Sequence, residues 1–232
     1  MAKKLVFQRF NLHHRIQHIG LFTSFIVLTI TGLPIKFDQS GISQGVVSMF
    51  GGFDNMFAVH LAAAAVMLVV GVYHLLYLAI YPLVTKKISL LALPSPKDFT
   101  DVIHDVQFLL GLRKDPPKFD RYSYTEKFDY WAVFWGIAIM GGSGLMLWFP
   151  QIAAQYVPRW VIDSARYAHT DEAILAISAI FIWHFYNVHL SPRVFPMSNI
   201  WYTGNITREE MEAQHPLELE RLDAERENEA RK

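Results

Sequence analysis

Six histidines of this 232-residue sequence lie inside or at the edges of long apolar segments: His18, His60, His74, His169, His184 and His189. An ionisable side chain within a membrane is costly and usually has a function, although any one buried histidine can simply bond a backbone carbonyl. The sequence contains no cysteine, which excludes disulfides and cysteine-ligated clusters. Metal chemistry would therefore use histidine, carboxylate or methionine, and neutral imidazole is a common metal ligand.

Two pairs of these histidines have a spacing that suits a pair of stacked cofactors. His60 and His74 are 14 residues apart, and His169 and His184 are 15 apart. In an α-helix these steps rotate by about −40° and +60° and rise by about 21 to 22 Å, so each pair stays close to one helix face. Two haems, one near each surface of a bilayer, would fit this spacing if histidines from different helices held each iron. Two imidazoles saturate haem iron, which favours electron transfer over oxygen binding.

Small residues lie near the same histidines. Ala62 to Ala65 follow His60, and Gly32 ends the first apolar segment. The third apolar segment contains Gly141, Gly142 and Gly144. Close helix packing explains such residues, and room for a flat macrocycle is the functional alternative.

The histidines require helices that cross a membrane, and four segments are suitable. A hydrocarbon core of about 30 Å takes roughly 20 helical residues, and the predicted spans are 16–35, 57–83, 131–149 and 168–190. The first is not a signal peptide, because its apolar run is too long and ends in Gly32-Leu33-Pro34. We predict an all-α membrane protein, with a four-span haem-binding domain over residues 1–206 and a charged tail over 207–232.

Basic residues predict the orientation of these spans. They concentrate before the first span and between the second and third: Lys3, Lys4, Arg9, Arg15, Lys86, Lys87, Lys97, Arg113, Lys114, Lys118, Arg121 and Lys127. Because such residues accumulate on the cytoplasmic side, both termini should face the cytoplasm of a bacterial or archaeal inner membrane. Residues 95–112 have helical apolar spacing and should lie along that surface. The tail from Thr207 is predicted to be a solvated helix or a partly disordered end.

Over nearly its whole length the chain resembles a known family through several motifs in order. Arg15-Ile16-Gln17-His18 is similar to the family's R-x-x-H motif, and Gly32 follows at the family's distance. The approach to the third span, its exit LMLWFPQIAAQYVP and the tail SNIWYTGNIT…QHP also match. The family is the cytochrome b (gamma) subunit of membrane-bound formate dehydrogenase, with hydrogenase-type dihaem cytochromes b more distant.

The resemblance implies two b haems. It assigns the periplasmic haem to His60 and His169, and the cytoplasmic haem to His18 and His184. His74 has no counterpart in the family, so it is either an alternative to His18 or an additional ligand, which would allow a third haem. The spacing of 15 between His169 and His184 also differs from the 14 expected in the family.

The resemblance further implies a quinone site beside the cytoplasmic haem. Ser123 and Glu126 lie where the family should have an asparagine and a glutamine, and they are candidate quinone contacts together with His189. His189 could bond a quinone carbonyl or deliver a proton, and it could equally be an interfacial histidine. Glu126 and Asp129 could form a proton entry route, but a helix N-terminus favours carboxylates in any case.

Other histidines are weaker candidates. His13 and His14 should be interfacial, although a surface haem using one of them with His189 is an open alternative. His104 and His215 lie in segments expected to be on the surface, and we do not predict them to be ligands.

These observations predict an electron-transfer subunit of a quinone-linked respiratory oxidoreductase. It would exchange electrons with menaquinone or ubiquinone and with an iron–sulfur or multihaem cytochrome c subunit on the periplasmic side. Its surroundings would be lipid, and no nucleic acid is expected as a partner. The competing hypothesis is a haem-free membrane anchor or small transporter, which should pair intramembrane histidines with acids. The spans carry almost no carboxylates except Asp171 and Glu172.

Overall fold

The computed structural model describes residues 5–86 and 91–231, so Lys3, Lys4 and Lys87 of the basic segments lie outside the described residues. Its contacts divide the chain into two compact units. Unit 1 contains residues 1–12, 88–132 and 183–232, and unit 2 contains residues 13–87 and 133–182. Each unit is therefore built from segments that are far apart in the sequence.

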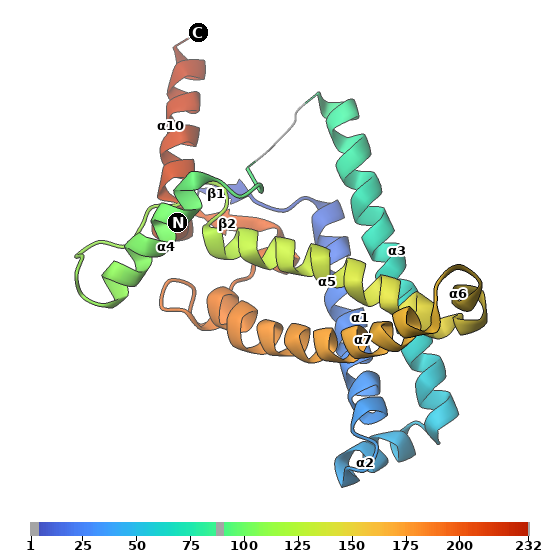
Figure 1. The fold of residues 1–232 in the computed structure, drawn as a ribbon. Coiled ribbons are helices and arrows are strands. Elements are labelled where there is room, and N and C mark those ends of the chain that lie inside the picture. Colours follow the sequence, from blue (N-terminus) through green and yellow to red (C-terminus); the bar gives the residue numbers. More distant parts are fainter. Residues whose placement is uncertain (1–4, 87–90, 232) are drawn as a thin grey trace. The chain divides into compact units, whose positions relative to one another are not determined.

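Four helices are long and apolar enough to cross a membrane, which confirms the predicted spans (Figure 1). They are α1 (Leu12–Lys36), α3 (Phe53–Thr85), α5 (Tyr124–Trp148) and a continuous helix over Arg159–Leu190. The last consists of α7 (Arg159–Ser178) and two π-helical segments, η1 (Ala179–His184) and η2 (Tyr186–Leu190). Large apolar side chains on these helices are exposed, for example Val69 and Leu83, as expected for surfaces that contact lipid.

In unit 2 the helices meet at small residues. A Cβ atom on Gly20 of α1 would lie 2.8 Å from Val70 of α3, and one on Gly141 of α5 would lie 3.0 Å from Leu68 of α3. Lys36 of α1 forms an ion pair with Asp171 of α7 at 2.9 Å. The glycines thus allow the close helix approach that is one of their two expected roles. Two short helices, α2 (Gly41–Met49) and α6 (Pro150–Tyr156), lie in the connections between the spans.

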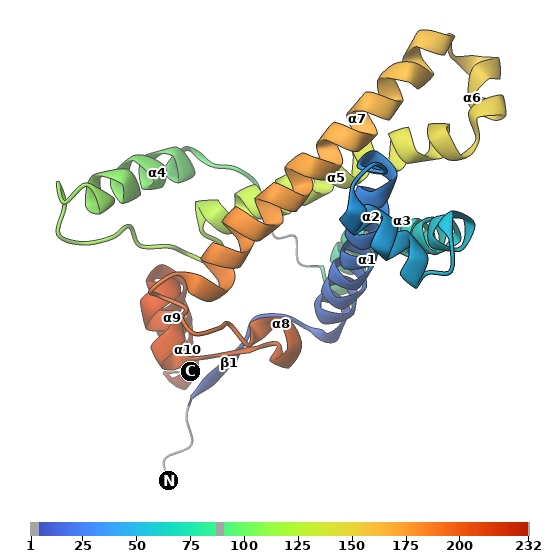
Figure 2. The ribbon, with the colours of Figure 1, turned by 90° about the horizontal axis from the view of Figure 1, so that it is seen from below.

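Unit 1 contains a small folded body made from both ends of the chain (Figure 2). Strand β1 (Val6–Gln8) pairs antiparallel with β2 (Asn205–Thr207), with Phe7 opposite Ile206. Helices α8 (Ile200–Thr203), α9 (Arg208–Gln214) and α10 (Pro216–Ala230) flank β2 in the sequence. Phe7, Ile206, Met211 and Leu219 form a buried apolar cluster. The tail is therefore helical as predicted, but one face of it is buried, and the two short strands were not predicted.

A buried charge cluster ties the tail to the rest of unit 1. The Arg9 guanidinium forms an ion pair with Glu218 of α10 and donates to the Arg121 carbonyl at 2.7 Å. Arg121 also contacts Glu218, at 2.9 Å. A buried ion pair that loses one partner leaves an uncompensated charge, so these residues depend strongly on one another.

His215 belongs to this cluster, and its expected surface position was wrong. Its side chain is buried at 3% exposure, with Nδ1 donating to the Asp120 carbonyl at 2.8 Å and Nε2 accepting from Arg9 at 3.0 Å. Burial lowers the pKa of His215, in agreement with a neutral ring that accepts at Nε2.

The predicted amphipathic segment forms helix α4 (Pro96–Leu109). Its acidic side is held in unit 1, because Asp98 pairs with Lys127 at 2.9 Å and Asp105 accepts from the Tyr124 hydroxyl at 2.8 Å. The apolar side is exposed and consists of Phe99, Val102, Ile103, Val106, Leu109 and Leu110. The contacts of α4 therefore leave the predicted membrane-facing stripe uncovered.

Replacing Ile206 with alanine should loosen the folded tail. Ile206 is 1% exposed, and removing a buried Ile side chain to Ala costs about 2–5 kcal/mol. Limited proteolysis of the detergent-solubilised protein should then cleave residues 205–231 much faster than in the unmodified chain. Leu5→Ala is the control, because Leu5 is exposed and only its carbonyl bonds the tail, at Arg208. Equal cleavage of the two variants would contradict the buried position of Ile206.

Candidate functional site

His60 of α3 has a defined orientation and tautomer. Its Nδ1 lies 2.9 Å from the hydroxyl of Thr31 on α1, and Thr31 is fully buried. The only hydroxyl hydrogen of Thr31 is directed to the Val27 carbonyl at 2.7 Å. The imidazole must therefore donate from Nδ1, which leaves the Nε2 lone pair available to a ligand.

His169 of α7 repeats this arrangement on the other helix pair. Its Nδ1 lies 3.0 Å from the hydroxyl of Ser143 on α5, and Ser143 donates to the Ile139 carbonyl at 2.6 Å. His169 therefore also donates from Nδ1 and keeps the Nε2 lone pair. The structure thus gives the same environment to the two histidines predicted to share one cofactor.

A glycine lies against each of these two rings. A Cβ atom on Gly32, which follows Thr31, would be 3.2 Å from His60 Cε1. A Cβ atom on Gly144, which follows Ser143, would be 3.1 Å from His169 Cε1. Both distances are tighter than ordinary van der Waals contact, so a larger side chain at either position would displace the ring. The repeated hydroxyl–glycine pair is a sequence signal that the histidine spacing alone did not reveal.

His74 is held in the same way. Its Nδ1 lies 2.9 Å from the Gln17 side-chain carbonyl on α1. An amide oxygen only accepts, so His74 donates from Nδ1. Gln17 is 6% exposed, so this hydrogen bond is made by a buried acceptor. His18 is the next residue along α1, is half-buried, and contacts Phe22 with 5.9 Å between ring centroids.

His184 has a charged acceptor. Its Nδ1 lies 3.0 Å from Asp129 Oδ2 in the second turn of α5. This is the one contact among the four that pairs a histidine with an acid, the pattern expected throughout a histidine–carboxylate transport pathway. His184 is the last residue of the π-helical segment η1. A π-helical turn accommodates one extra residue and occurs often at functional sites, which explains how a spacing of 15 replaces the expected 14.

Ser123 and Glu126, the predicted quinone contacts, form the start of α5. The Glu126 carboxylate accepts from the Ser123 backbone N–H at 2.7 Å, and the Glu126 backbone N–H donates to the Ser123 hydroxyl at 3.2 Å. This reciprocal arrangement is a capping box, which satisfies the first amide groups of a helix. Glu126 also lies 3.4 Å from Arg9. Both residues therefore have a structural role at the first turn of the span.

His189, the third predicted quinone contact, lies in η2. Its ring meets Phe185 edge to face, with 5.4 Å between centroids. Among the described residues, Nδ1 of His189 is a buried polar atom for which no hydrogen-bond partner is found. His13 instead bonds the Tyr73 hydroxyl at 2.6 Å, and His104 bonds the Asp115 carbonyl at 3.0 Å. These contacts give His13 and His104 ordinary structural partners.

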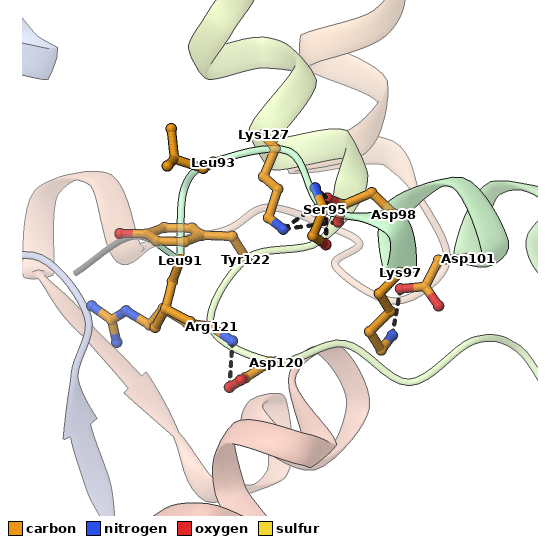
Figure 3. A pocket seen from close by; sticks show the side chains of 10 residues that line it. All are labelled: Leu91, Leu93, Ser95, Lys97, Asp98, Asp101, Asp120, Arg121, Tyr122 and Lys127. Carbon is orange, nitrogen blue, oxygen red and sulfur yellow. Dashed lines mark hydrogen bonds and ion pairs between the residues drawn. The ribbon is translucent and has the colours of Figure 1, made fainter.

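Unit 1 contains a pocket of about 190 Å³ (Figure 3). It is lined by Leu91, Leu93, Ser95, Lys97, Asp98, Asp101, Asp120, Arg121, Tyr122 and Lys127. Its charges are paired with each other or with the tail, as in Lys127 with Asp98, Lys97 with Asp101 and Asp120 with Arg221. The described lining includes none of the six intramembrane histidines and neither Ser123 nor Glu126.

Comparison with known proteins gives the family. Residues 9–195 match the family described as prokaryotic cytochrome b561. Over 140 residues the chain is 24% identical to the cytochrome b556(Fdn) subunit of nitrate-inducible formate dehydrogenase from Escherichia coli K12. The same values hold for the corresponding proteins of Escherichia coli O157:H7 and Shigella flexneri. The match covers 59% of this chain and 62% of each relative, so the chain spans less than two thirds of their length.

The family match extends through all four spans and confirms the resemblance seen in the sequence. The family name implies haem b, and the relatives are subunits of a larger enzyme. Together with the four apolar helices, these findings identify a multi-pass membrane cytochrome of the b type that functions in electron transfer. The chain belongs to the prokaryotic cytochrome b561 family.

Proposed function

We propose that the chain is the dihaem b subunit of a quinone-linked oxidoreductase, and that it passes electrons between a periplasmic redox subunit and the quinone pool. Haem b, when bound, supplies a one-electron couple between ferric and ferrous iron. Two axial imidazoles keep such an iron saturated, which is the ligation suited to electron transfer. The protein's own contribution is to hold these imidazoles and to control their surroundings.

The observation that carries this proposal is the matched environment of His60 and His169. Each ring donates from Nδ1 to a buried hydroxyl on the neighbouring helix, at 2.9 and 3.0 Å. Metal-ligating histidines commonly fix their second nitrogen in this way, which sets the tautomer and the ring orientation. We therefore assign one haem to His60 and His169.

The glycines beside these rings fit the same group. The missing side chains of Gly32 and Gly144 leave the edge of each imidazole uncovered where a Cβ atom would crowd it. Among the described residues there is no cluster of three or more His, Cys, Asp or Glu arranged to hold a metal ion. A porphyrin supplies four ligands itself and needs only two from the protein, so paired histidines are sufficient.

We assign the second haem to His184 and to one of two residues on the first two spans. The resemblance supports His18, at the family's R-x-x-H position. The hydrogen bond from His74 to Gln17 supports His74, because it fixes the ring through Nδ1, as the hydroxyl contacts do for His60 and His169. If both residues are ligands, the chain holds a third haem.

The proposed quinone site and partner are supported by the family resemblance. The relatives are subunits of formate dehydrogenase, and we propose that this chain exchanges electrons with an iron–sulfur or multihaem cytochrome c subunit. Menaquinone or ubiquinone would bind near the cytoplasmic face, where Ser123, Glu126 and His189 are the candidate contacts. His189 is suited to bond a quinone carbonyl because its Nδ1 has no partner among the described residues. Both termini are proposed to face the cytoplasm.

A spectrum and a haem count test the proposal directly. The purified protein should show a b-type α-band in its reduced-minus-oxidised spectrum and two haems in a pyridine haemochrome assay. His60→Ala and His169→Ala should each reduce the count from two to one. His104→Ala is the control and should keep both haems, because His104 bonds only the Asp115 carbonyl. A protein without an α-band would be a haem-free anchor or transporter instead.

Substitution of the glycines tests the space beside the rings. Gly32→Leu and Gly144→Leu should each remove the haem assigned to His60 and His169, because the new side chain would push against an imidazole Cε1 atom. Gly142→Leu provides the control, since a Cβ atom there would meet nothing within 4 Å. The haem count should fall from two to one in the first two variants and stay at two in the third. Loss in Gly142→Leu alone would contradict this assignment.

His18→Ala and His74→Ala decide the second ligand set. If His18 is the ligand opposite His184, its variant should hold one haem and His74→Ala should hold two. If His74 is the ligand, the two counts should be reversed. A count of three in the unmodified protein would mean that both residues bind iron. Gln17→Leu should reproduce the loss in His74→Ala more weakly, because outer partners of metal ligands typically change metal affinity about 10- to 100-fold.

A further inference from the structure

The four hydrogen bonds that orient candidate iron ligands do not have equivalent acceptors. Thr31 and Ser143 accept through hydroxyls and Gln17 accepts through an amide, so three of the acceptors are neutral. The fourth acceptor is the Asp129 carboxylate, 3.0 Å from His184 Nδ1. Asp129 is thus the ionisable one among these four acceptors, and it bonds the proposed ligand of the second haem.

The Asp129 carboxylate is directed at the His184 imidazole, and the neighbouring lysine is engaged elsewhere. The ion pair described for Asp129 is with His184, and its side chain is 22% exposed. The nearest lysine in the sequence, Lys127, is 2.9 Å from both carboxylate oxygens of Asp98 and is thereby engaged on α4. The negative charge of Asp129 is therefore directed at the ring that it orients.

A carboxylate acceptor changes the electronic character of a ligand histidine. Hydrogen bonds to ionised groups are roughly twice as strong as neutral ones, and a carboxylate partner raises the basicity of the imidazole. A more basic ligand and a nearby negative charge both favour the ferric over the ferrous state. The midpoint potential of the iron held by that ring is lowered as a result.

We propose that Asp129 is a positioning residue that lowers the midpoint potential of the haem held by His184. The hydroxyl acceptors of His60 and His169 carry no charge and have no such effect. The hydrogen-bond acceptors of the ligand histidines therefore give the two haems different midpoint potentials. This inference rests on the proposed function, because it requires His184 to be an iron ligand. Through Asp129 the chain itself would set the free energy of electron transfer between the haem on His184 and the proposed quinone site.

The test is a potentiometric titration of Asp129→Asn, which keeps the size and the acceptor oxygen of the side chain but removes its charge. The variant should retain two haems by pyridine haemochrome. The midpoint potential of one of its two haems should rise by at least about 59 mV, which corresponds to a tenfold change in the equilibrium constant of a one-electron step. The other step should stay in place. Titration of His60→Ala, which should hold only the haem on His184, identifies the step that has to move.

Asp105→Asn is the matched control. It removes the same charge within unit 1, but Asp105 bonds Tyr124 and Arg193 and contacts none of the candidate ligands. Both of its redox steps should remain at the values of the unmodified protein. Equal potentials in Asp129→Asn and Asp105→Asn, with two haems in each, would overturn the role of Asp129 and leave the dihaem assignment intact. An unmodified protein without haem would overturn the proposed function itself.

A second variant covers the case in which Asp129→Asn loses a haem. Asp129→Glu keeps the carboxylate and should hold two haems with both potentials near those of the unmodified protein. A raised potential in Asp129→Glu would contradict the proposal, because the charge is still present. A retained low potential would support it.

Discussion

The hydrogen bond from an imidazole Nδ1 to the neighbouring helix is the interaction on which the proposed site depends. A histidine in an apolar span has a polar N–H that needs an acceptor, because leaving it unpaired is costly. For four of the histidines the acceptor comes from another helix, so the bond that satisfies the ring also fixes the helix contact and the orientation of the imidazole. Thr31, Ser143, Gln17 and Asp129 provide these acceptors for the four rings.

This constraint also explains the spacing of the residues. On α1, Gln17 and Thr31 are 14 residues apart, which equals the separation of their partners His74 and His60 on α3. On α5, Asp129 and Ser143 are again 14 apart, whereas their partners His184 and His169 are separated by 15 residues. Two helices can keep both contacts only if the rise and rotation between the two contacting residues are the same in each helix. The π-helical segment η1 accommodates the one extra residue of the last span.

The spans and the amphipathic helix could be predicted because hydropathy and spacing reflect local chain geometry. The acceptors could not, since a serine or threonine in an apolar helix usually bonds a carbonyl of its own helix, and Thr31 and Ser143 do this as well. The strands and the buried contacts of the tail could not be predicted for a different reason. Its strands have three residues each, and the contact of Arg9 with Glu218 joins residues 209 positions apart.

The π-helical turn has a consequence for comparing relatives of this chain. An extra residue between two candidate ligand histidines is normally scored as an insertion, which would displace every later residue of the helix by about 100°. Here the backbone accommodates that residue locally, and the ring at its end still reaches its acceptor. A gap placed within residues 179–183 of an alignment would therefore keep the functional positions in register. A gap placed in the loop before α7 would wrongly pair His169 with its neighbour.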